Sequence, residues 1–219
     1  MGLFSSKSVA QPIAEEEKAK RMRDMYAAYK FDEQGVQDVT PATVSAWQAE
    51  SGHELIVVDV RTEAEQQISM IPGAITETAF ARRGGAKLLQ KLAAKRPVRC
   101  VAYCTIGKRS GDFCVALSKI LASDLDTAHS LKIFNLAGSI LAWTHAGLDL
   151  VAPKGNHLEE ACSDVNESAS EKEQAKGPRT MAVHAFGAKW AAVVPQKHDV
   201  HIFQRPIMSF LVDKMKRKN

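Results

Sequence analysis

The stretch that decides the fold is VRCVAYCTIGKRSGDFCVALSKILA, residues 98–122. Its first part, VRCVAYC (98–104), is a nearly continuous apolar run, which is typical of a strand covered on both faces of a parallel sheet. From Ser110 onward the apolar residues follow helical spacing. The pattern therefore predicts a buried strand, a tight loop at 104–109 and a helix.

Neighbouring segments repeat this alternation of strand and helix. LIVVDV (55–60) and LKIFNL (131–136) are further apolar runs of strand length. Helices are predicted over 40–52, where Thr40 caps and Pro41 starts the first turn, over 86–95, and over 138–147. TEAE (62–65) matches a capping box. Strands alternating with helices predict an α/β fold, in which a small parallel sheet is flanked by helices.

Composition divides the chain into four parts. Residues 1–35 are predicted to be a polar tail and an exposed helix, and residues 36–152 the α/β domain. Residues 153–179 are rich in Ser, Glu and Lys and nearly free of large apolar side chains, which predicts a polar linker. Residues 180–219 contain more apolar residues than a free end would. We therefore expect this C-terminal extension to pack on the core, beside the mouth of the site.

The overall composition narrows the class of protein. Apolar residues make up 45% and charged residues 25% of the 219, as in soluble globular proteins. A net charge of +4 gives no support for nucleic-acid binding. The four cysteines form no CxxC pair and no zinc-ligand spacing, so neither a metal nor a cofactor is expected. No apolar run of signal-peptide length is present near Met1, which predicts a cytoplasmic protein.

The loop at 104–109 has the composition of a site for an anion. Cys104 follows a buried strand and precedes a helix, which is where ligands bind in open parallel sheets. Gly107 permits a tight turn with inward amide groups, Lys108 and Arg109 add positive charge, and Ser110 is placed to cap the helix. These groups favour the thiolate, so Cys104 is predicted to be an activated nucleophile. The alternative is a buried structural cysteine.

Four motifs, VVDVRTEAE, IPGA, YCTIGKRS and NLAGSILAWTHAGLDL, follow one another in the order found in rhodanese-like domains. The chain resembles this family over residues 36–152, and the resemblance implies a sulfurtransferase whose cysteine, here Cys104, carries a persulfide. Residues 105–109 correspond to the loop around that sulfur, with Lys108 and Arg109 as catalytic partners. Substrate-binding roles are implied for the following residues: Thr105, Ile106, Gly107, Ser110, Asp59 and Arg61. Trp143 matches a packing residue of the closing helix.

The resemblance also implies a reaction. A small anionic sulfur donor such as thiosulfate transfers sulfur to Cys104, and cyanide or a thiol then accepts it. Six residues from Cys104 to Arg109 match the sulfurtransferases, whereas phosphatases of this fold use a loop one residue longer. Ser69 and Met70 replace the family's usual glycine and histidine before IPGA, Ala137 replaces a glycine, and Asp149 replaces a proline. The alternative is a persulfide relay or binding module that docks a protein partner and turns over small donors poorly.

The first residues, MGLFSS, match the acceptor pattern for N-myristoylation, with Gly2 as the acylated residue if the source is eukaryotic. One such chain gives only weak membrane binding. A basic segment, KMKRK (214–218), is a second candidate membrane contact, so a peripheral membrane partner is one interpretation. The alternatives are a plain disordered N-terminus and, for KMKRK, the solvated end of a helix.

Overall fold

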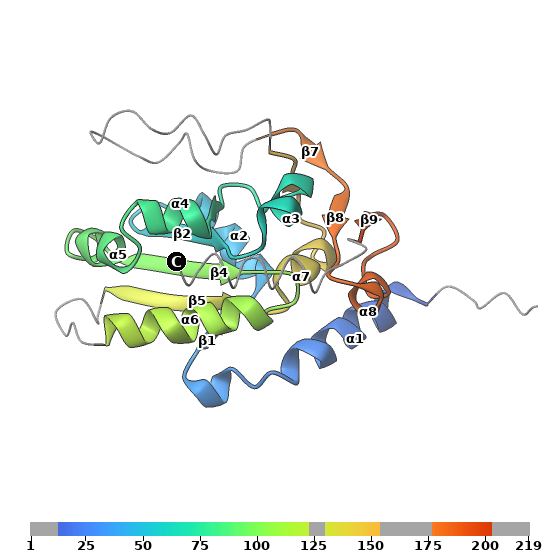
Figure 1. Ribbon diagram of the computed structural model, residues 1–219, viewed down its shortest axis with the longest axis horizontal. Helices are drawn as coiled ribbons and strands as arrows, with labels where there is room; N and C mark the ends of the chain where they lie inside the picture. Colours follow the sequence, from blue (N-terminus) through green and yellow to red (C-terminus); the bar gives the residue numbers. More distant parts are fainter. Residues whose placement is uncertain (1–12, 123–129, 154–176, 203–219) are drawn as a thin grey trace, which may run out of the picture.

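The computed structural model describes residues 13–122, 130–153 and 177–202. A five-stranded parallel sheet, in the order β1-β5-β4-β2-β3, forms its centre (Figure 1). The strands are β1 (Gln37–Val39), β2 (Glu54–Asp59), β3 (Ile75–Thr76), β4 (Val98–Tyr103) and β5 (Leu131–Leu136). Strand β4 lies in the middle, so both its edges and both its faces are covered, which explains its continuous apolar run.

Side chains of successive strand residues point to opposite faces and build two apolar clusters. One face packs against helices α4 (Glu77–Arg82), α5 (Ala86–Ala93) and α6 (Lys108–Leu121). The other face packs against α1 (Glu15–Ala27), α2 (Pro41–Ala49) and α7 (Ser139–His145). In β4, for example, Ala102 belongs to the first cluster and Val101 to the second. The result is the predicted three-layer α/β fold.

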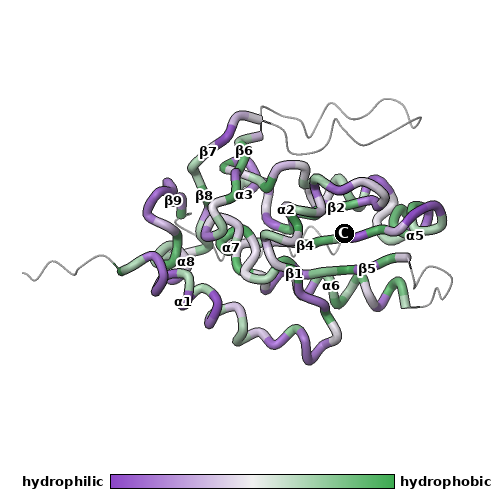
Figure 2. Tube along the Cα trace, turned by 180° about the vertical axis from the view of Figure 1, so that it is seen from behind, coloured by the Kyte–Doolittle hydropathy of each residue, from purple (hydrophilic) through white to green (hydrophobic). Residues whose placement is uncertain are grey.

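The C-terminal extension packs beside α1 and α7, at the end of the sheet toward which β4 points (Figures 1 and 2), and its buried residues belong to the second cluster. Its elements are β7 (Arg179–Thr180), β8 (Ala182–His184), α8 (Ala188–Ala191) and β9 (Asp199–His201). Strand β7 pairs with β6 (Leu150–Val151), and β8 pairs with β9. Helix α3 (Glu63–Ile68) contacts β8. Lys18 of α1 donates a hydrogen bond to the carbonyl of Val194 at 3.1 Å, so the two ends of the described chain are tied together.

The structure confirms the strands predicted at 55–60, 98–104 and 131–136 to within one residue. The sequence patterns missed β1, β3 and α4, which are short elements of two to six residues. The helix predicted to be exposed near the N-terminus is α1, but Met22 and Lys18 on one side of it are buried. The remaining predictions for the tail, most of the linker and residues 203–219, including Gly2 and KMKRK, lie outside the described residues.

Within the three described ranges, no helix combines the length and the apolar character needed to cross a bilayer.

Candidate active site

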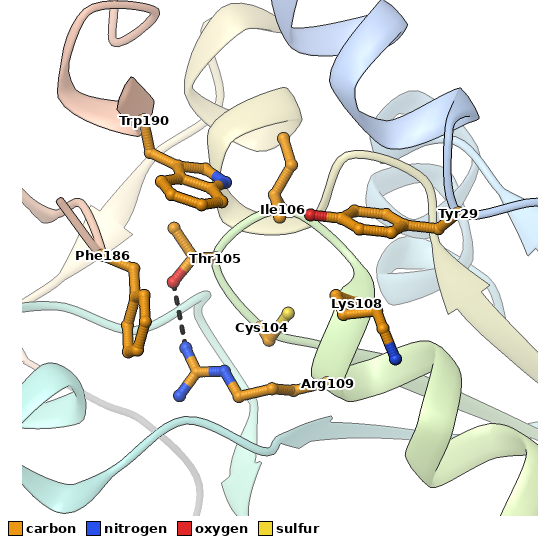
Figure 3. A pocket seen from close by; sticks show the side chains of 8 residues that line it. All are labelled: Tyr29, Cys104, Thr105, Ile106, Lys108, Arg109, Phe186 and Trp190. Carbon is orange, nitrogen blue, oxygen red and sulfur yellow. Dashed lines mark hydrogen bonds between the residues drawn. The ribbon is translucent and has the colours of Figure 1, made fainter. Parts of the chain in front are cut away.

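Cys104 is the first residue after the central strand β4. It lies at the carboxyl ends of the strands, where α6 and α7 begin. Its backbone amide donates to Oγ of Ser139 at 3.0 Å, and its carbonyl accepts from the amide of Ile140 at 3.2 Å. The amide of Gly107 donates to Sγ of Cys104 at 3.2 Å. The loop therefore curls around the sulfur atom, which points into the space that the loop encloses (Figure 3).

Gly107 is required by geometry. Its φ of +113° is unfavourable for other residues, and a Cβ atom there would lie 2.3 Å from the ring of Tyr26. Because Gly107 is the N-cap, helix α6 begins at Lys108, two residues earlier than predicted. The expectation that Ser110 caps the helix was therefore wrong. Ser110 lies inside the first turn, and its hydroxyl donates to Oδ1 of Asn135 at 2.7 Å.

The surroundings of Cys104 favour its thiolate. Burial raises the pKa of this thiol, but the charge of Arg109 and hydrogen bonds from Ser110 and Gly107 lower it, and the net pKa lies below the ordinary value. The other two described cysteines differ from it. Burial alone raises the pKa of Cys100 to about 12, and burial together with neighbouring negative groups raises that of Cys114 as well. Cys104 is thus the described cysteine suited to nucleophilic attack.

A buried carboxylate holds Arg109 in place. Glu65 accepts two hydrogen bonds from the Arg109 guanidinium, at 2.7 and 2.8 Å, and a third from Oγ1 of Thr105 at 3.2 Å. Nδ1 of His184, from β8, lies 3.0 Å from Glu65. Burial raises the pKa of Glu65, but the bonds from Arg109 and His184 outweigh it and hold the pKa well below its usual range. Arg109 is therefore oriented by α3 and β8 together.

The side chain of Lys108, the first residue of α6, is about half exposed. Its ammonium group pairs with Asp112, with nitrogen–oxygen distances of 2.6 and 2.7 Å, and both side chains are about half exposed. Both cations of the loop are thus paired with a carboxylate. An exposed pair of this kind contributes little to stability, but it reduces the positive charge that an entering anion would meet.

Asp59, the last residue of β2, and Arg61 form a buried hydrogen-bonded pair. Nη2 of Arg61 donates to Asp59 at 2.7 Å and to the carbonyl of Ser69 at 2.6 Å. The hydroxyl of Tyr103 donates to Asp59 at 2.6 Å and accepts from the amide of Ile71 at 3.1 Å. This network ties β2, β4 and the segment before β3 together. Neither residue is among those that line the cavity over Cys104.

A cavity of about 240 Å³ lies over the sulfur atom of Cys104. Its floor comes from the loop, and the contributing residues are Cys104, Thr105, Ile106, Lys108 and Arg109. Its walls are three aromatic side chains from outside the loop: Tyr29, Phe186 and Trp190 (Figure 3). Residue Cys104 is only 1% exposed, so a reagent reaches its sulfur through this cavity.

Glu65, His184 and the three aromatic residues were not identified as site residues from the sequence. Glu65 was recognised only as the end of a capping box, a role that it also performs, since it accepts from the amide of Thr62 at 3.0 Å. The apolar composition of the tail gave the one usable signal for Phe186 and Trp190. Within the described residues, no cluster of His, Cys, Asp and Glu suits a metal ion.

Known proteins resemble the part of the chain that contains the loop around Cys104. Residues 40–146 match the model of the rhodanese-like domain family. A sulfurtransferase of Allochromatium vinosum is 31% identical over 102 residues, covering 47% of this chain and 83% of that protein. A Saccharomyces cerevisiae protein, described as a homolog of single-domain rhodanese and of the Cdc25 phosphatase catalytic domain, aligns with a TM-score of 0.40 at 19% identity, over 50% of this chain and 80% of its own.

A thiosulfate sulfurtransferase from Pseudomonas aeruginosa aligns with a TM-score of 0.38 at 23% identity, over 61% of this chain and 22% of its own. The sequence match spans the elements from α2 to α7, including the strand–loop–helix unit around Cys104. The chain belongs to the rhodanese-like domain family, and it has a sulfurtransferase among its relatives.

Proposed function

We propose that the protein is a sulfurtransferase that moves a sulfane sulfur from thiosulfate or a similar donor, through a persulfide on Cys104, to cyanide or a thiol. The observation that carries the proposal is the environment of Cys104, whose lowered pKa favours the thiolate at the end of β4. A thiolate attacks sulfur, and inward amide groups stabilise the resulting anion.

The reaction has two displacement steps. First, the Cys104 thiolate attacks the outer sulfur of the donor, the bond between the two donor sulfur atoms breaks, and sulfite leaves with the bonding pair. Second, the acceptor attacks the outer sulfur of the persulfide, and the Cys104 thiolate is released. The amide of Gly107 and the guanidinium of Arg109 are placed to stabilise negative charge on Cys104 in both steps.

The alternative of a relay to a protein thiol requires a cysteine of the partner to enter the aromatic cavity, since Cys104 is only 1% exposed. Phosphatase activity is disfavoured by the six-residue loop from Cys104 to Arg109. A small aryl phosphate, which we expect not to be hydrolysed, tests it directly.

The decisive test is the intact mass of the protein after incubation with thiosulfate. The wild type is expected to gain one sulfur atom, which cyanide then removes. Cys104→Ser is expected to gain none. Cys100→Ser, which alters a buried cysteine with a raised pKa, is the matched control and is expected to behave like the wild type. Absence of added sulfur on the wild type would contradict the proposal.

A further inference from the structure

The walls of the cavity come from segments outside the family domain. Tyr29 lies before residue 40, and Phe186 and Trp190 lie after residue 146, whereas the family match covers 40–146. Phe186 and Trp190 pack edge to face, with ring centroids 6.4 Å apart. The guanidinium of Arg109 lies 5.1 Å from the Phe186 ring centroid, so the aromatic wall stands directly beside the loop.

Charge pairing leaves the aromatic walls of this cavity without a charged group that would attract an ionic acceptor. Arg109 is paired with Glu65, and Lys108 with Asp112. The surface that faces the cavity is almost entirely apolar. A charged acceptor group placed against these rings would lose much of its hydration free energy, so the walls favour an acceptor whose organic group is uncharged.

The cavity does suit an organic molecule of moderate size. A cavity of about 150 Å³ with apolar walls is known to bind benzene, and the volume here is about 240 Å³. A flat apolar ring therefore fits in the cavity against the side chains of Phe186 and Trp190, with room for a short link to a sulfur atom that lies against Cys104. Such a ligand gains by burial of its apolar surface and by contact with the two rings.

We propose that Phe186 and Trp190 form a specificity subsite that selects, as the sulfur acceptor, a small organic thiol with an aromatic or bulky alkyl group. This inference rests on the proposed function. The sulfur of the acceptor R–SH attacks the outer sulfur of the Cys104 persulfide anion. The bond between that sulfur and Sγ breaks, its electron pair stays on Sγ as the thiolate, and R–S–SH leaves with the proton on the transferred sulfur. No oxidant or reductant is consumed.

The experiment measures two steps separately: the loading of sulfur onto Cys104 and the transfer of that sulfur to an acceptor thiol. Cys104 is loaded with a large excess of thiosulfate, the excess is removed, and the intact mass establishes that one sulfur atom is present. The loaded protein is then mixed with 2-phenylethanethiol or with 2-mercaptoethanol, and the loss of that sulfur is followed by mass. The two acceptors share a primary thiol on a two-carbon chain and differ mainly in a phenyl group against a hydroxyl group.

The measured quantity is the ratio of the two transfer rates. In the wild type we expect the phenyl compound to react faster. Trp190→Ala is expected to lower the ratio by about tenfold, since a site that loses apolar contact discriminates less by this order. Phe186→Ala is expected to lower it by a smaller factor. Met181→Ala, which changes an exposed side chain of the same extension, is the matched control and is expected to leave the ratio unchanged.

The intrinsic reactivities of the two acceptor thiols do not depend on which protein variant is used. A change in the rate ratio between variants therefore reports on the subsite. A wild-type ratio near one, or a ratio that neither Trp190→Ala nor Phe186→Ala changes, overturns the inference while leaving the proposed function standing. Failure of the wild type to take up sulfur at the loading step overturns the proposed function instead, and this inference with it. A variant that does not fold is recognised by its thermal unfolding, and the other variant and the wild-type ratio then decide.

Discussion

At the scale of single residues, Arg109 has two roles that depend on its exact position. Its charge lowers the pKa of Cys104, and its two terminal nitrogen atoms bind Glu65. A lysine could supply the charge but not the paired hydrogen bonds, because a guanidinium presents its donors in a fixed plane. The reactivity of Cys104 is therefore tied to a carboxylate on another element.

This dependence predicts a pH effect. The rate at which iodoacetamide alkylates Cys104 is expected to rise with pH at a midpoint below that of free cysteine, because the thiolate is the reactive form. Arg109→Gln removes the positive charge and is expected to move the midpoint to higher pH. Arg99→Gln, which removes a partly exposed cation paired with Glu50, is the control and should leave the midpoint where it is. An unchanged midpoint in Arg109→Gln would falsify this account.

At the scale of elements, the six-residue helix α3 is stabilised at its start by a reciprocal cap. The hydroxyl of Thr62 accepts from the amide of Glu65 at 3.4 Å, and Glu65 accepts from the amide and the hydroxyl of Thr62, each at 3.0 Å. Because Glu65 also binds Arg109, the cap of α3 and the loop around Cys104 share one carboxylate. Helix α4 has the same length but a simpler cap, in which Thr76 accepts from Ala79.

The two caps allow a matched comparison. Thr76→Ala is expected to lower the free energy of unfolding by about 1 kcal/mol, the usual cost of a lost cap. Thr62→Ala is expected to cost about 2 kcal/mol, since it also removes a hydrogen bond to a buried charged group. Urea unfolding of both variants measures the difference. A smaller loss for Thr62→Ala than for Thr76→Ala contradicts the shared role of Glu65.

At the scale of the whole molecule, the C-terminal extension is part of the main core. Val183, Ala185, Val193 and Val194 are all at most 2% exposed and belong to the cluster that covers one face of the sheet. The same extension supplies Phe186 and Trp190 to the cavity. Folding of the extension and assembly of the cavity are therefore coupled.

Two valines that are partners in the β8–β9 register test this coupling. Val183 is fully buried, whereas Val200 is 40% exposed. Val183→Ala is expected to lower the free energy of unfolding by about 2 kcal/mol, from lost burial and the cavity left behind. Val200→Ala is expected to cost less than about 0.5 kcal/mol. A single unfolding transition is expected for both. A separate early transition for the extension, or equal costs, contradicts a common core.

Much of the fold follows from local sequence patterns. The three long strands are mainly apolar segments, the caps at Thr40 and Thr62 are local signals, and the loop around Cys104 is one uninterrupted segment. The short elements β1, β3 and α4 were missed because two to six residues carry too little periodicity to distinguish a strand or helix from a turn. The start of α6 was misplaced because Gly107, rather than a polar side chain, forms its N-cap.

The sequence by itself determined the α/β class, the position of Cys104 at the end of a buried strand and the glycine that lets the loop close. These features depend on residues close together in the chain, whose spacing and conformational preferences are local properties. Only the tertiary structure decided that Arg109 pairs with Glu65, 44 positions away, and that His184, 119 positions from Glu65, joins them. It also decided that Phe186 and Trp190 wall the cavity over Cys104. Such contacts arise from the packing of β8 and α8 against the sheet domain, which no local pattern encodes.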